Sequence, residues 1–485
     1  MRVPGSGRSA VAGSPAFLRL RTESGRCLGA AALAACLFAP VAVHGQAVRM
    51  EVNDSDASKG VYLCWAPVEA SVALTHPSQS DSTVTLSSSG AVALMFQSGS
   101  VPPKDRFAPA DALEVTLPSS GAPVIVSIAA KWTPAHRASE LAGDIHLVVR
   151  SRDNTIAEFP VTVRVRKNAE TLTTDERDRL LKALGTLERM GWFDRYAAIH
   201  HAAGSLVHSG TMSRSVFLAW HRALLLDLER RLQELDPSVA LPYWDFTAAA
   251  PRLFSADFLG SVSEGTSVVS FAATNPLNGF RVNLGFDTSS FEAHGPLRRN
   301  PTDRLASGGA IPGEILEATL SAISSAPNYA VANELIQNNF HTAVHTVVGY
   351  YMAVTDTAAV DPLFFLLHAN VDRQWALWQQ ASGARQNPGT DTGYSPRGKF
   401  ADDCCQPRTA FADEPLWPWN NSSALQDPHS DAGGDPPDSS LRLPFPRTPG
   451  HGPAGMEPLV KEMVDYLDTG GQTRSLGYCY DDIGF

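Results

Sequence analysis

Six histidines with the spacing of metal ligands fall into two groups that lie far apart in the chain. The first group is His200 (or its neighbour His201), His208 and His221, and the second is His341, His345 and His368. Imidazole nitrogen binds copper, zinc, iron and nickel in proteins. No carboxylate or thiolate motif accompanies either group, so the pattern favours a pair of copper ions that bind dioxygen between them.

The second group is predicted to be complete. His341 and His345 are four residues apart, which on a helix places their Cβ atoms about 5–6 Å apart on one face. Two imidazoles so placed can converge on one metal ion. His368 is expected on a second helix that starts at Asp361-Pro362, with Asp as the N-cap and Pro at the first helical position.

The first group depends on the surroundings of His221. An apolar stripe at helical spacing runs from Phe217 to Leu232, so His221 points into a core. A single histidine there is more often a core residue than a ligand, but the flanking Trp220-His221-Arg222 and the downstream Leu241–Asp245 favour a ligand. The first member remains open between two neighbours, and the spacing from Tyr196 favours His200 over His201.

At this point the sequence resembles a known family. Residues 217–229 together with Leu241–Asp245 resemble the copper A region of the tyrosinase family, and residues 341–375 resemble its copper B region. Leu476–Asp481 resembles the tyrosine-bearing strand that ends the catalytic core of this family. The resemblance covers about residues 166–485 and leaves the N-terminal part of the chain unexplained.

The resemblance implies a mainly α-helical core in which four helices hold a dinuclear type-3 copper centre. Its two copper ions would oxidise small phenolic substrates to ortho-quinones, with dioxygen as the second substrate. Carried over residue by residue, the implied ligands are His200, His208 and His221 for copper A, and His341, His345 and His368 for copper B.

The middle ligand of copper A departs from the family pattern. The family usually places it nine residues before the histidine that corresponds to His221, and Met212 occupies that position here. His208 lies thirteen residues before His221. We expect a longer loop that still brings His208 to the metal. The alternative is a copper ion with only two protein ligands.

Three further positions bear on the substrate. Thr342 stands where family members that hydroxylate monophenols often have Asn, and Leu367 stands where His is common. Glu334 is the only carboxylate upstream of His341 that is placed to hold an activating water, and a solvated helix residue is the alternative interpretation. Together these positions favour oxidation of ortho-diphenols over that of monophenols.

The beginning of the chain predicts export. Five arginines precede an apolar run from Cys27 to Val43, and small residues follow before Gln46. We expect residues 1–45 to be a signal peptide and the protein to be secreted or periplasmic, with a single membrane anchor as the alternative. No later segment is long and apolar enough to span a membrane. The net charge of -11 argues against nucleic acid and anionic membranes as partners.

Residues 47–165 differ from the rest of the chain. Short alternating runs such as Val124–Ile128 and Ile145–Val149 are separated by Ser, Gly and Pro clusters, which predicts an Ig-like all-β sandwich. The chain is therefore expected to be multi-domain, with a helical core over 166–485 and an irregular excursion at about 381–453. Cys64, Cys404, Cys405 and Cys479 remain after signal removal, and their pairing is open.

Two other functions compete with the oxidase. A catalytically weak or silent copper-binding module would act through its β-sandwich, and a dioxygen carrier of the hemocyanin type would use the same copper pair. A further hypothesis gives the sandwich the task of shielding the site or of docking to an unidentified protein partner.

Overall fold

The computed structural model describes most of the chain beyond the predicted signal peptide. The described residues are 47–102, 104–133, 138–208, 216–286, 288, 292–308, 313–382, 385, 416–419, 441, 443, 445–446, 458–468 and 475–484. The predicted signal peptide, Cys404 and Cys405, and most of the excursion at 381–453 lie outside them. Within the described ranges, no helix has the length and apolarity needed to cross a bilayer.

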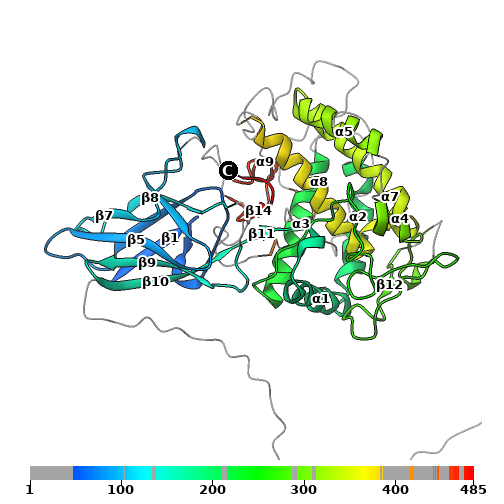
Figure 1. The fold of residues 1–485 in the computed structure, drawn as a ribbon, viewed down its shortest axis with the longest axis horizontal. Helices are drawn as coiled ribbons and strands as arrows, with labels where there is room; N and C mark the ends of the chain where they lie inside the picture. Colours follow the sequence, from blue (N-terminus) through cyan, green and yellow to red (C-terminus); the bar gives the residue numbers. More distant parts are fainter. Residues whose placement is uncertain are drawn as a thin grey trace, which may run out of the picture. The chain divides into compact units, whose positions relative to one another are not determined.

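The N-terminal region is β-rich, as predicted. Its strands are β1 (Val48–Val52), β2 (Ser55–Asp56), β3 (Val61–Leu63), β4 (Val68–Leu74), β5 (Ser82–Gly90), β6 (Leu94–Ser98), β7 (Leu113–Leu117), β8 (Val124–Ala130), β9 (Ile145–Ser151) and β10 (Asn154–Val163). They form two five-stranded sheets, in the orders β2-β1-β4-β8-β6 and β3-β10-β9-β5-β7. Neighbouring strands are antiparallel except β3 and β10, which are parallel. Figure 1 shows these strands in blue and cyan.

Alternation along the strands explains why the two sheets form. In β1 the side chains of Val48, Met50 and Val52 are buried, whereas Arg49 and Glu51 are exposed. Successive side chains of a strand point to opposite faces, so one face of the sheet is apolar and is buried against another apolar face. This region and the helical region belong to one compact unit, Ala42–Phe485, and the boundary at 165/166 therefore stays a prediction.

The second region is mainly helical, as predicted. Its helices are α1 (Thr174–Arg189), α2 (Trp192–His208), α3 (Val216–Leu235), α4 (Asp303–Gly308), α5 (Gly313–Ser325), α6 (Tyr329–Glu334), α7 (Thr342–Val348), α8 (Pro362–Gln380) and α9 (Val460–Val464). A π-helical segment, η4 (Leu335–His341), joins α6 to α7. Helix α3 packs against α2, α8 and α9, and η4 packs against α7 and α8. The long helices α3 and α8 appear in Figure 1 in green and yellow.

The end of the chain returns to the start of the helical region. Strand β11 (Val165–Arg166) pairs in parallel with β14 (Cys479–Tyr480), and two further short strands, β12 (Arg281–Asn283) and β13 (His294–Pro296), pair elsewhere. A disulfide joins Cys64 to Cys479, which resolves one pairing that the sequence left open. Trp65 Nε1 donates a hydrogen bond to the backbone oxygen of Tyr480 at 3.1 Å. The β-rich region is therefore bonded directly to β14.

Candidate metal centre

The structure gathers the six predicted histidines into two clusters. His200, His208 and His221 form the first cluster, and His341, His345 and His368 form the second. Within each cluster the nearest ring nitrogens lie within 4.8 Å of one another. Helix α2 supplies two histidines and α3 one, while the junction of η4 and α7 supplies two and α8 one. The clusters thus depend on four helical segments from separate parts of the chain.

Helix α8 begins as the sequence predicts. The Asp361 side chain is the N-cap and accepts the Leu363 N–H at 2.8 Å, with Pro362 at the start of the helix. Arg299 donates two hydrogen bonds to the same carboxylate, each at 2.7 Å. Because Asp361 and Arg299 are fully buried, this pair holds the first turn of α8 rigidly and with it the position of His368.

Hydrogen bonds to the backbone orient four of the six imidazoles. The Nδ1 atoms donate to carbonyl oxygens in the pairs His200 to Thr355 (2.7 Å), His221 to Phe217 (2.8 Å), His341 to Gln337 (3.2 Å) and His345 to Met352 (2.6 Å). A carbonyl oxygen can only accept, so Nδ1 must be the protonated nitrogen of each ring. In a neutral imidazole this leaves the Nε2 lone pair free to bind a metal ion.

The surroundings keep all six rings neutral near pH 7. Burial is the largest cause and lowers the pKa of each histidine, and neighbouring histidines lower the pKa of most of them further. The pKa falls to about 4 for His208 and for His345. Neutral imidazole is the form that binds metals.

The ring nitrogens are arranged as metal ligands are. In the first cluster, Nε2 of His200 lies 3.4 Å from Nε2 of His221, and neither atom carries a proton, so the two lone pairs repel each other. A metal ion about 2.0–2.1 Å from each nitrogen, as in zinc–histidine sites, spans about 3.3 Å between them at the tetrahedral angle. The residues present therefore fit a metal ion.

The second cluster has a similar arrangement. Nε2 of His368 lies 3.2 Å from Nε2 of His341 and 3.3 Å from Nε2 of His345. The Nε2 lone pairs of His341 and His345 therefore converge on one point. A single N–H on His368 cannot donate to both of these nitrogens. An all-imidazole donor set suits copper, zinc, iron or nickel.

The two clusters adjoin and form one six-imidazole centre. The rings of His221 and His368 stack with centroids 4.2 Å apart and planes inclined by 8°. Phe217 and Phe364 each contact both clusters. Phe217 lies 5.0 Å from the His341 ring, and Phe364 lies 4.9 Å from the His200 ring and 4.1 Å from the His368 ring. Both phenylalanines are fully buried, so they exclude water from two sides of the centre.

The six histidines differ in exposure. His200, His221 and His368 are at most 2% exposed, whereas His341 and His345 are 6% and 8% exposed. His208 is only partly buried. His208, His341 and His345 are therefore the rings of the centre with the most exposure.

The structure places His200, and not His201, in the first cluster. The His201 side chain is 42% exposed, and its Nδ1 lies 3.4 Å from the carboxylate of Asp356. Its ring stacks on Phe286 at 4.2 Å. His208 joins the cluster in spite of its unusual spacing, because α2 extends as far as His208 and presents it beside His200, with ring centroids 4.8 Å apart.

The three predicted substrate residues have different surroundings. Glu334 is exposed at the end of α6. Thr342 is also exposed, and its hydroxyl donates to the backbone oxygen of Gln337 at 2.9 Å. Leu367 is completely buried, so its side chain does not reach solvent. Their effects on the substrate stay predictions. Gln337 also contacts the centre, since it is bonded to the backbone of His208 and to the ring of His341. A lone glutamine gives no signal of a metal centre in the sequence.

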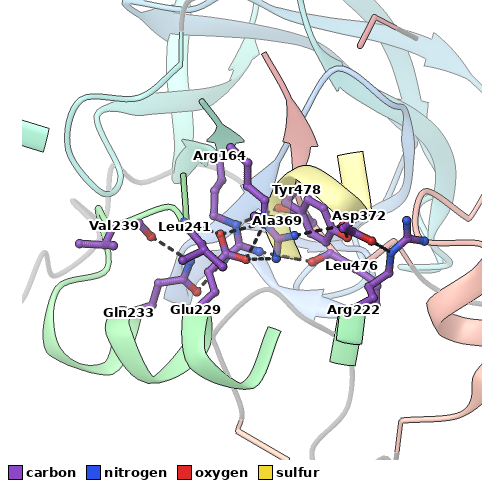
Figure 2. A network of polar contacts seen from close by, with 12 residues as sticks. Arg164, Arg222, Glu229, Gln233, Val239, Leu241, Ala369, Asp372, Leu476 and Tyr478 are labelled. Carbon is purple, nitrogen blue, oxygen red and sulfur yellow. Dashed lines mark hydrogen bonds and ion pairs between the residues drawn. The ribbon is translucent and has the colours of Figure 1, made fainter. Parts of the chain in front are cut away.

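A buried polar network joins α3, α8 and the C-terminal strand (Figure 2). Asp372 is the central acceptor of this network and follows His368 by one helical turn. Its carboxylate receives the Arg222 Nε–H at 2.6 Å, the Tyr478 hydroxyl at 3.0 Å and the Tyr480 hydroxyl at 2.6 Å. Because Arg222 directly follows His221, this network fixes α3, α8 and the C-terminal strand relative to one another.

A second buried pair extends this network. Arg166 donates to the Glu229 carboxylate at 2.7 Å and to Asp372 at 3.3 Å, and the backbone N–H of Leu241 donates to Glu229 at 2.9 Å. Burial alone would raise the pKa of Glu229, but the positive charges of Arg166 and Arg164 and these hydrogen bonds lower it below its ordinary value. Glu229 is therefore a buried, paired carboxylate.

Comparison with known proteins agrees with this geometry. The family profile described as "Common central domain of tyrosinase" matches residues 190–381. A tyrosinase from Streptomyces glaucescens is 33% identical over 286 residues, which is 53% of this chain and 93% of that protein. Hemocyanin 2 from Megathura crenulata is 29% identical over 233 residues, which is 46% of this chain but 6% of that protein. The solved structure of a functional unit from octopus hemocyanin is 19% identical to this chain, with a TM-score of 0.37. The match covers 63% of this chain and 72% of the hemocyanin chain.

The fold and the paired histidine clusters define a protein of the type-3 copper class. The chain belongs to the tyrosinase family. This confirms the resemblance found in the sequence, which implies two copper ions for the two histidine clusters.

Proposed function

We propose that this protein is a copper oxidase that converts ortho-diphenols to ortho-quinones with dioxygen. The ligands are His200, His208 and His221 for one copper ion, and His341, His345 and His368 for the other. The single observation that supports this most strongly is the contact between the clusters, where the His221 and His368 rings stack at 4.2 Å. A two-metal centre suits a reaction that moves electrons in pairs.

In the proposed reaction, two ortho-diphenol molecules each lose two electrons and two protons, and one dioxygen molecule is reduced to two waters. When bound, the copper ions transfer electrons from the diphenol to dioxygen. The chain positions the copper ligands and keeps water away from them. The backbone carbonyls of Thr355, Phe217, Gln337 and Met352 hold four imidazoles in one tautomer, while Phe217 and Phe364 exclude water.

The same site favours diphenols over monophenols. A monophenol must first lose its proton and be hydroxylated, so it benefits from a group that holds a water beside the copper ligands. The Thr342 hydroxyl already donates to the Gln337 carbonyl, and Glu334 is exposed to solvent. The one O–H of Thr342 is therefore not free to donate to a water, and the Glu334 carboxylate lies at an exposed position, so we propose only weak monophenol oxidation.

We further propose that the protein is exported, with residues 1–45 as the signal peptide, and is secreted or periplasmic. The Cys64–Cys479 disulfide supports this location, because disulfides persist in oxidising compartments.

The test is to load the protein with copper, measure copper per chain, and assay a catechol and a monophenol side by side. We expect two copper ions per chain, rapid oxygen consumption with the catechol and slow consumption with the monophenol. Equal rates on both substrates would refute the inference from Thr342.

A second candidate is a dioxygen carrier, which the similarity to hemocyanin 2 favours. Reversible oxygen uptake without catechol oxidation would support the carrier in place of the oxidase. Copper binding without either catechol oxidation or reversible oxygen uptake would leave the silent copper-binding module, which would act through its β-sandwich.

A further inference from the structure

We propose that Gln337 is a positioning residue that holds the two histidine clusters in register. This rests on the proposed copper function and deepens it, because it explains how the unusual first cluster is completed. Gln337 lies in the π-helical segment η4 and is 8% exposed. It is bonded to one histidine of each cluster.

The side chain of Gln337 holds the first cluster. Its Nε2 atom donates a hydrogen bond to the backbone oxygen of His208 at 3.0 Å. His208 is the last residue of α2 that the structure describes. The amide of Gln337 therefore holds the backbone of α2 at the residue that supplies the imidazole.

The backbone of Gln337 holds the second cluster. Its carbonyl oxygen accepts the His341 Nδ1–H at 3.2 Å, the Thr342 hydroxyl at 2.9 Å and the Thr342 backbone N–H. The last of these is an i to i+5 bond. In an ordinary α-helix this carbonyl would bond to the backbone N–H of His341. The π-helical turn shifts that bond by one residue, to Thr342. The same carbonyl also accepts the His341 imidazole, as the Phe217 carbonyl accepts the His221 imidazole in α3.

The two connections act on rings that face each other. The His208 and His341 rings are stacked with centroids 6.3 Å apart and planes inclined by 25°. One residue is bonded both to the backbone of His208 and to the ring of His341, so Gln337 links these two ligands of different clusters. His208 is also the histidine whose spacing departs from the family pattern. Gln337 thus supplies tertiary support at the end of α2, where His208 lies.

The experiment compares two variants of the full chain with a control. Gln337→Met keeps the volume of the side chain without the N–H donor, and Gln337→Asn keeps the amide but withdraws it from His208. Asn338→Ala is the control, because Asn338 is an exposed amide on the same π-helical segment. Each protein is loaded with copper(II), dialysed against a weak chelator, and measured for copper per chain and for its electron paramagnetic resonance signal.

Two adjacent copper(II) ions couple and give no such signal, whereas an isolated copper(II) ion gives one. Wild type and Asn338→Ala should keep two copper ions and remain silent. Both Gln337 variants should lose copper from the first cluster, with about 10–100-fold weaker affinity, and show the signal of one copper ion. That signal should match the one from a His221→Ala variant, which lacks a ligand of the first cluster only.

The outcomes separate this inference from the proposed function. Wild type that binds no copper would overturn both. Wild type with two copper ions, together with either Gln337 variant that keeps two and stays silent, would overturn the role of Gln337 alone. Urea unfolding of the metal-free proteins identifies a variant that has failed to fold, and the other variant then decides.

Discussion

Asp372 offers a sharp test of how the helices beneath the metal centre are held. Its side chain is 3% exposed and accepts hydrogen bonds from Arg222, Arg166, Tyr478 and Tyr480. Asp372→Asn keeps the shape of the side chain but removes its charge. The new amide N–H group also faces N–H and O–H groups that already point at this side chain, so donors are placed against donors. The guanidinium of Arg222 then loses its only carboxylate partner among the described residues.

The expected cost is about 3–5 kcal/mol in the free energy of unfolding, the range for breaking a buried ion pair from one side. Arg166 keeps its 2.7 Å bond to Glu229, so the lower end of the range applies. His368 lies one turn earlier on the same face of α8. Displacement of α8 should therefore also weaken copper retention.

The assay is urea unfolding of the metal-free protein at pH 7 with the disulfide intact, with tryptophan fluorescence as the probe. Asp482→Asn is the matched control, because Asp482 also pairs with an arginine, Arg373, but its side chain is 38% exposed. An exposed pair contributes about 0–1 kcal/mol. If Asp372→Asn costs no more than Asp482→Asn, then the buried network does not anchor the helices.

Three further predictions follow from the same contacts. His200→Ala should lower the copper content by about one ion per chain, because His200 is one residue of a three-histidine cluster. His201→Ala should leave the copper content unchanged. Metal analysis measures both, and equal losses would contradict the assignment of His200. Cys64→Ser opens the disulfide to Cys479 and should lower the free energy of unfolding by about 2–4 kcal/mol; an unchanged urea midpoint would show that the link contributes nothing. The pKa of Glu229 is lowered in the folded protein, so this carboxylate stabilises the fold above pH 4.5, and that stability is lost as the pH falls through the folded pKa. Glu229→Gln should therefore be less stable than wild type at pH 7 and should lose less free energy of unfolding on acidification. Parallel profiles of stability against pH would refute this.

Much of the metal centre could be predicted because its signals are local. The separation of His341 and His345 and the Asp361-Pro362 helix start depend only on helical geometry. The structure changes one detail, since His341 ends a π-helical segment and does not lie within α7. The two rings still reach a common point, because His345 Nδ1 bonds to the Met352 carbonyl and turns its Nε2 inward.

The choice between His200 and His201 could not be made from local signals alone. Both residues lie on α2, where neighbours differ by about 100° around the axis, so either ring was able to face the core. The contact of His200 with the Thr355 carbonyl decides between them, and Thr355 is distant in sequence. The burial of Leu367 could not be predicted either, because its position in a motif does not indicate how exposed its side chain is.

The sequence by itself determined the donor types, their helical spacing, the β-rich and helical halves and membership of the tyrosinase family. Tertiary structure decided which distant groups meet: Cys64 with Cys479, Arg166 with Glu229, and Gln337 with His208. The physical reason is that helical periodicity and capping are set by neighbours in the chain, whereas a buried hydrogen bond exists only where packing brings a donor to an acceptor. The two histidine clusters required both, since each residue was visible in the sequence and their contact was not.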